Sequence, residues 1–186
     1  MSIAPRLLSW LEGQQSEMLA LLRSWVEQET PTAEPARVRA LAEAVAREFE
    51  QVACRARMHE AAVELEYGAG AAGKPTLLLG HLDTVYPVGT LALSPWKEEA
   101  GRIVAPGVYD MKAGVVMALY ALRALAAAGA EPGWPVRLLF VFDEETGSRQ
   151  SRALTEAVAR ECRAALVLEP GAEADGKLKI ARKGIG

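Results

Sequence analysis

The sequence predicts an α/β protein with a mainly parallel central sheet flanked by helices. Short, continuous apolar runs at residues 76–80, 136–142 and 165–168 have the length and composition of buried strands. A segment of helical character separates each run from the next, at residues 111–128 and 151–161. Because strands that alternate with helices pair in parallel, we expect one sheet with helices on its faces.

Two amphipathic helices are expected before the first of these strands. Residues 5–28 carry large apolar side chains at roughly helical spacing and are predicted to form one helix. Pro31 and Pro35 then bracket a turn. In residues 34–50 apolar side chains recur at i, i+3, i+4 and i+7, which predicts a second helix. This second helix is expected to be peripheral scaffold.

Further strands are expected around these elements. Residues 54–59 and 63–67 are β-like and precede a loop rich in glycine and alanine. Residues 87–106 mix glycine, proline and short strand-like pieces such as 102–104, so their structure is the least certain from sequence. Residues 177–181 are predicted to form one more strand.

Composition favours one compact domain and excludes several partners. The chain has 186 residues, 51% of them hydrophobic, which is enough for one substantial core. A net charge of -3 gives no electrostatic footprint for nucleic acid or an anionic membrane surface. The two cysteines, Cys54 and Cys162, make no disulfide framework, and the N-terminal residues lack the pattern of a signal peptide. We therefore expect an untargeted, cytoplasmic chain.

Six residues that can bind or serve a metal ion lie at or just after the predicted strands or at a helix start. They are His81, Asp83, Asp110, Glu144, Glu145 and Glu169. Each has an ordinary explanation by itself, such as a helix cap, an acid in a first helical turn or a turn residue. Polar groups converge outside the carboxyl ends of strands in an open α/β sheet. The joint pattern therefore predicts a carboxylate-rich dinuclear metal site.

The residue types in this group suit amide hydrolysis. His81 and Asp83 are two apart in an extended chain and share one side, so the acid can hold the second ring nitrogen of a ligating histidine. Glu144 and Glu145 point apart, so one can bind metal while the other handles protons. Two divalent ions polarise a carbonyl and lower the pKa of a trapped water towards about 7. The imidazole and carboxylate mixture suits zinc, although cobalt or manganese fits the same ligands.

Four motifs in this order resemble the di-zinc exopeptidase family, which includes glutamate carboxypeptidase, aminoacylase, acetylornithine deacetylase and succinyl-diaminopimelate desuccinylase. They are Gly80-His81-Leu82-Asp83-Thr84-Val85-Tyr86-Pro87, Gly107-Val108-Tyr109-Asp110-Met111-Lys112-Ala113-Gly114, Asp143-Glu144-Glu145-Thr146-Gly147-Ser148 and Leu168-Glu169-Pro170. The first and third look most like the glutamate carboxypeptidase branch. The resemblance implies a metallopeptidase acting on a small peptide or an N-acyl amino acid.

The resemblance also implies a role for each site residue. Asp110 would bridge two zinc ions, with His81 and Glu169 completing the protein ligands of one ion and Glu145 binding the other. Glu144 would be the general acid and base, and Asp83 would orient His81. The peptide bond between Asp110 and Met111 is expected to be cis, as it often is in this family.

The resemblance further implies that residues 1–186 are the N-terminal portion of a catalytic domain. Family members continue into a lid or dimerisation domain and then into a late segment with a second ligating histidine, which this chain lacks. One metal site is thus expected to be complete, and the isolated chain to be inactive. An acetylornithine deacetylase or desuccinylase type of amidohydrolase stays open as an alternative. So does a non-catalytic folding or interaction module that forms a homodimer.

Overall fold

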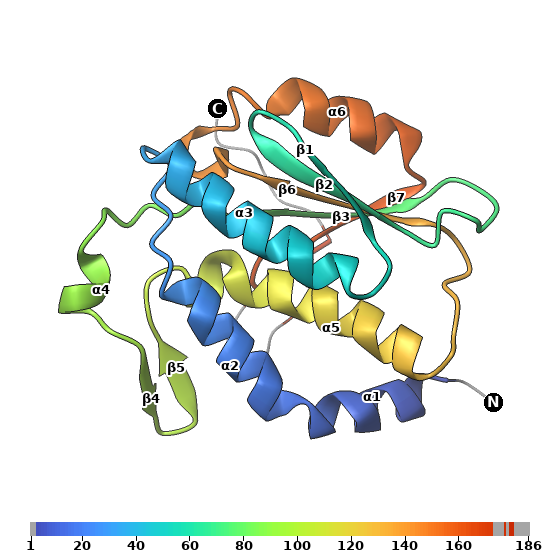
Figure 1. Cartoon of the computed structure of the whole chain (residues 1–186), viewed down its shortest axis with the longest axis horizontal. Helices are drawn as coiled ribbons and strands as arrows, with labels where there is room; N and C mark the ends of the chain where they lie inside the picture. The colour runs from blue at the N-terminus through green and yellow to red at the C-terminus, as the bar shows by residue number, and fades with distance from the viewer. Residues whose placement is uncertain (1–2, 173–176, 178, 181–186) are drawn as a thin grey trace.

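The protein is an α/β layer structure in which one sheet has helices on both faces (Figure 1). The computed structural model describes residues 3–172, 177, 179 and 180. The helices are α1 (Ala4–Gly13), α2 (Gln15–Val26), α3 (Pro35–Glu50), α4 (Thr90–Leu93), α5 (Ala113–Ala127) and α6 (Arg152–Glu161), with a π-helical turn η1 (Val108–Lys112) and a 3₁₀ turn η2 (Glu144–Thr146). The strands are β1 (Arg55–Met58), β2 (Ala62–Tyr67), β3 (Thr76–His81), β4 (Lys97–Glu99), β5 (Arg102–Val104), β6 (Val136–Val141) and β7 (Ala164–Val167).

The main sheet has the strand order β1-β2-β6-β3-β7. The strands β6, β3 and β7 run parallel to one another, and the β1–β2 hairpin joins β6 antiparallel. The predicted α/β class, with a sheet that is parallel in its centre and flanked by helices, is confirmed. The strands predicted at residues 76–80, 136–142 and 165–168 correspond to β3, β6 and β7, with ends that differ by one residue.

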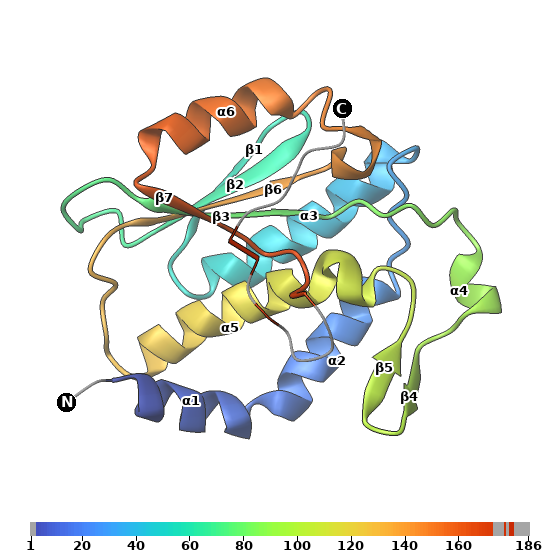
Figure 2. The ribbon, with the colours of Figure 1, turned by 180° about the vertical axis from the view of Figure 1, so that it is seen from behind.

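Alternating side chains of the central strands face two different cores. Val63, Leu65, Leu138 and Phe140 point towards α2, α3 and α5 and are fully buried there. Leu77, Leu139 and Val141 point the other way and pack with Val158 of α6. Figures 1 and 2 show α6 alone on one face and the N-terminal helices with α5 on the other. Burial on both faces explains why these strands are apolar throughout.

The helix predicted for residues 5–28 is in fact two helices, so that prediction was wrong in its middle. The chain bends at Gln14, directly after Gly13, which is the last residue of α1. A straight helix of that length would extend about 35 Å. The bend allows both α1 and α2 to contact α5, as Figure 2 shows.

The segment between β3 and α5 projects to one side of the sheet and holds α4 and the β4–β5 hairpin (Figure 1). The strand-like piece at residues 102–104 is confirmed as β5. Glu29 anchors this segment, because its carboxylate accepts the backbone N–H groups of Gly89 and Leu91 at 2.8 Å each. The strand predicted at residues 177–181 falls partly outside the described residues. Within them, Lys177 forms an isolated β-bridge with Ala172.

The strand β7 is an edge of the main sheet and its side chains are exposed on both faces. Leu166 and Val167 are 56% and 57% exposed. Among the helices of the described residues, none combines the length and apolarity that a membrane crossing requires.

Candidate metal centre

Three parallel strands bring their carboxyl ends to one edge of the sheet. His81 ends β3 and is paired with Val141, the last residue of β6. Leu168 follows β7 and donates its backbone N–H to Leu79 at 2.9 Å. The segments that follow these strands carry Asp83, Glu144, Glu145 and Glu169, so the topology gathers these residues at one edge.

Asp110 reaches the same place from a different part of the chain. It lies in η1, which starts after Gly107 and leads directly into α5. Gly107 has φ of 70°, and a Cβ there would lie 2.7 Å from a methyl carbon of Thr84. The peptide bond between Asp110 and Met111 is cis, as predicted.

His81, Asp110 and Glu169 form a group whose potential ligand atoms all lie within 4.8 Å of one another. Nε2 of His81 is 3.0 Å from Oδ1 of Asp110 and 3.5 Å from Oε1 of Glu169. Two ligand atoms about 2.1 Å from a tetrahedral zinc ion are about 3.4 Å apart. The spacing and the donor set of one imidazole and two carboxylates therefore fit a zinc ion with little rearrangement.

Glu144 and Glu145 lie beside this group in η2. Oε2 of Glu144 is 3.9 Å from Nε2 of His81, and its side chain is 47% exposed. Among the described residues, Glu145 is not part of the group of three. Its carboxylate lies near enough for the charge of His81 to lower its pKa and that of Asp110 to raise it. Glu144 is thus the acid that stands next to the three ligand candidates without being one of them.

Asp83 is completely buried and connects His81 to η2. Nδ1 of His81 is 3.0 Å from the main-chain oxygen of Asp83 and 3.4 Å from its Oδ1. The same carboxylate accepts the backbone N–H groups of Glu144 and Glu145, both at 3.2 Å. Asp83 therefore fixes the imidazole and the loop that carries both glutamates.

The carboxylates of this site differ in how readily they ionise. Burial opposes the charge of His81, but hydrogen bonds with Asp83 and Glu169 raise the pKa of His81 to about 11. The hydrogen bond with His81 lowers the pKa of Glu169, whereas desolvation raises the pKa values of Glu144 and Glu145. The potential that favours a proton on His81 also favours a divalent cation beside it.

Two residues that contact this region were missed by sequence reasoning. Thr32 donates from Oγ1 to Oδ2 of Asp83 at 2.6 Å. Lys112 is 2% exposed and donates from Nζ to the carbonyl oxygens of Trp25 and Gln28, at 3.0 and 2.8 Å. Burial lowers the pKa of Lys112 to about 7, against the opposing effect of the negative charge of Glu29. Its position two residues after Asp110 was the available signal.

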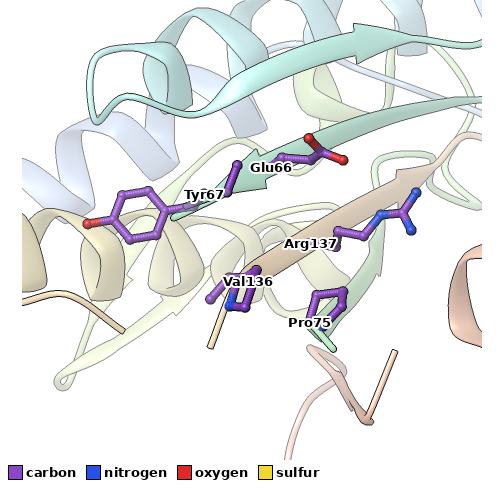
Figure 3. Close-up of a pocket in the computed structure, with 7 residues that line it drawn as sticks. Glu66, Tyr67, Pro75, Val136 and Arg137 are labelled. Atoms are coloured by element: carbon purple, nitrogen blue, oxygen red, sulfur yellow. The ribbon is translucent and has the colours of Figure 1, made fainter. Parts of the chain in front are cut away.

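A separate cavity lies at the opposite end of the sheet. It measures about 210 Å³ and is lined in part by Tyr67, Pro75, Val136 and Arg137 (Figure 3). Val136 begins β6 and Pro75 precedes β3, whereas the metal ligand candidates follow the other ends of the parallel strands. This cavity is therefore not part of the candidate metal centre.

Comparison with known proteins identifies the family of the chain. Residues 77–182 match the sequence profile of Peptidase family M20/M25/M40. Carboxypeptidase G2 of Pseudomonas sp. (strain RS-16) is 37% identical over 116 residues, which are 62% of this chain and 28% of that protein.

Solved structures share the fold at low sequence identity. Human carnosine dipeptidase 1 aligns over 88% of this chain with a TM-score of 0.75 and 16% identity. A metallo-carboxypeptidase of Sulfolobus solfataricus aligns over 86% with a TM-score of 0.68 and 22% identity. The chain spans 40% and 39% of those two structures.

The chain has the α/β fold of these solved structures, with a candidate metal centre at the carboxyl ends of its parallel strands. The chain belongs to Peptidase family M20/M25/M40, since the family profile covers more than half of it.

Proposed function

We propose that the chain is the N-terminal portion of the catalytic domain of a zinc-dependent hydrolase. The reaction is cleavage of an amide bond in a small peptide or an N-acyl amino acid. The observation that carries this proposal is the convergence of His81, Asp110 and Glu169 within 4.8 Å, with the Glu144 carboxylate 3.9 Å from the imidazole. The folding of parallel strands does not by itself place a buried histidine beside three carboxylates at their carboxyl ends.

The residues divide into those that hold a cation and one that moves a proton. His81, Asp110 and Glu169 would hold one zinc ion, and Asp110 and Glu145 would supply carboxylates for a second. A bound ion supplies Lewis-acid polarisation of the scissile carbonyl and a water that ionises near neutral pH. Glu144 accepts the proton from the attacking water and delivers it to the leaving nitrogen. Its raised pKa suits both steps.

The substrate is proposed to carry a C-terminal glutamate. The 37% identity with a relative named a carboxypeptidase supports a carboxypeptidase type of cleavage. The strand-end motif Asp83-Thr84-Val85-Tyr86-Pro87 and the motif that begins at Glu144 support the glutamate carboxypeptidase branch.

Replacement of Glu144 tests the proposal. We expect Glu144→Gln to reduce the release of glutamate from an N-acyl glutamate by about 10²- to 10⁴-fold, because the proton carrier is lost. Zinc binding should persist, because Glu144 is not among the three clustered ligands. Since the chain spans 28% of its relative, turnover is measured with this chain and with the longest open reading frame that contains it.

Glu17→Gln in α2 is the matched control, because Glu17 is an exposed glutamate far along the chain from η2. It should leave turnover and zinc binding unchanged. Full turnover in the Glu144→Gln protein would remove Glu144 from the mechanism. Absence of zinc binding by the unaltered chain would contradict the proposed function as a whole.

A further inference from the structure

The Asp83 carboxylate is surrounded by hydrogen-bond donors from three separate segments. Its Oδ1 lies near Nδ1 of His81 and accepts the N–H of Glu144, while its Oδ2 accepts the N–H of Glu145. The remaining donor is the hydroxyl of Thr32, at 2.6 Å from Oδ2. This contact is the shortest of the four, and it comes from the connection between α2 and α3, outside every motif that the sequence analysis assigned to the site.

The backbone of that connection is held in register with the segment after β3. Thr84 donates its N–H to the carbonyl of Thr30 at 2.8 Å, and Thr32 donates its N–H to the carbonyl of Thr84 at 3.3 Å. The hydroxyl of Thr30 donates to the carbonyl of Leu82 at 2.7 Å. These bonds flank Asp83 on both sides, so the Thr32 hydroxyl is presented to Oδ2 by a fixed backbone.

We propose that Thr32 is a positioning residue of the metal centre, which sets the orientation of the Asp83 carboxylate and through it the His81 imidazole. The inference rests on the proposed metal site. A carboxylate can rotate about its terminal torsion, and the donors on Oδ2 determine whether Oδ1 faces Nδ1 of His81. Loss of the hydroxyl removes the shortest of these donors from a buried charge, so both the rotation and the basicity of the carboxylate change.

The test compares two substitutions at Thr32. Thr32→Val keeps the shape of the side chain and removes the hydroxyl, whereas Thr32→Ser keeps the hydroxyl. We expect Thr32→Val to weaken Co²⁺ binding by about tenfold and to alter the visible absorption bands of the bound ion, because groups that orient metal ligands have effects of this size. Thr32→Ser should restore both the affinity and the spectrum. Affinity is measured by competition with a chromophoric chelator.

Thr155→Val is the matched control. The Thr155 hydroxyl is likewise part-buried and donates a hydrogen bond, in its case to the main-chain carbonyl of Ser151 at 3.1 Å, but it lies in α6. This variant should keep the affinity and spectrum of the unaltered chain. The unfolding free energy of each metal-free variant shows how much of any change is general destabilisation.

The outcomes separate this inference from the function on which it rests. Unaltered Co²⁺ affinity and spectrum in Thr32→Val, with normal binding by the unaltered chain, would overturn the role of Thr32 and leave the metal site intact. Failure of Thr32→Ser to restore binding would also overturn it. If the unaltered chain bound no Co²⁺, both proposals would fall.

Discussion

At the scale of single residues, Glu64 is a carboxylate buried on the sheet face that α6 covers. It is 6% exposed, forms an ion pair with Arg137 and is hydrogen-bonded to His59. Arg137 also reaches Glu161 of α6, which connects the helix to the sheet. The His59 side chain is 19% exposed and belongs to this cluster.

The Glu64 cluster predicts a specific pH dependence of stability. Burial opposes the Glu64 charge, but the hydrogen bonds with Arg137 and His59 outweigh it and lower the pKa of Glu64. A lowered folded-state pKa gives stability that is present above the unfolded value near 4.5 and is lost as pH falls through the folded value. Glu64→Gln should cost about 2 kcal/mol at pH 7, and the difference should shrink below about pH 4.5.

Urea unfolding between pH 3 and pH 7 measures this effect. Glu66→Gln is the control, because Glu66 is an exposed glutamate two residues further along β2. It should leave the profile unchanged. Parallel profiles for Glu64→Gln and the unaltered chain would show that the cluster does not stabilise the fold through its charge.

Single-residue chemistry was predictable where a motif carried it. His81, Asp110 and Glu169 were selected because imidazole and carboxylate groups at strand ends have few reasons to coincide, and the structure brings these three together. Thr32 and Lys112 act through contacts with segments 51 and 84 to 87 residues away in sequence. No local sequence pattern indicates such contacts, so these two residues could be identified only from the folded structure.

At the scale of elements, the start of α5 is packed directly against the chain that leaves β7. A Cβ placed on Gly114 would lie 2.2 Å from the carbonyl oxygen of Leu168. The next residue, Glu169, is a ligand candidate. Glycine at this position therefore allows the β7 end and the Asp110 turn to approach each other.

Substitution of Gly114 should damage both stability and the metal site. Replacing a helical glycine by alanine normally raises the free energy of unfolding by about 0.5–1 kcal/mol. Gly114→Ala should instead lower it by about 3 kcal/mol, because the main chain of Leu168 must move. Zinc affinity should fall as well, since Glu169 shifts with Leu168. Thermal unfolding and zinc titration measure the two effects.

Gly13→Ala is the control for Gly114→Ala. Gly13 is also helical, and no atom lies within 4 Å of a Cβ placed there. That variant should be neutral or slightly more stable. A Gly114→Ala protein with normal stability and normal zinc affinity would contradict the close approach of α5 and β7.

Helices and strands could be predicted where the pattern of apolar residues was strong, and they were missed where it was weak. Apolar continuity identified β3, β6 and β7, and the i, i+3, i+4 pattern identified α3, because burial imposes those patterns directly. The bend at Gln14 is set by packing of α1 and α2 on α5, which leaves no periodic signal. The short helix α4 is anchored by Glu29, about 60 residues earlier in the chain, so its sequence alone did not identify it.

At the scale of the whole molecule, the candidate metal centre joins segments that are far apart in sequence. His81, Asp110 and Glu169 come from β3, η1 and the chain after β7. An ion that binds all three stabilises the folded chain relative to any state in which these segments are separate. Folding and metal binding are therefore expected to be coupled.

Metal removal should lower the unfolding free energy by a predictable amount. At a free ion concentration one hundred times the dissociation constant, the folded chain gains about 2.7 kcal/mol. We expect one tightly bound ion per chain by elemental analysis, and a loss of this gain after chelation or in Asp110→Asn. Two tightly bound ions, or an unfolding free energy that does not respond to chelation, would contradict the single complete ligand set.

The central position of β6 has a consequence for how the protein is made. The strands β2 and β3 follow each other in sequence, yet in the sheet they are separated by β6, which pairs with both. A chain that emerges from the ribosome therefore presents the unpaired edges of β2 and β3 until Val141 has been synthesised. Such edges are templates for pairing with other chains. The nascent chain therefore offers these edges to other chains during the interval between synthesis of β3 and synthesis of β6.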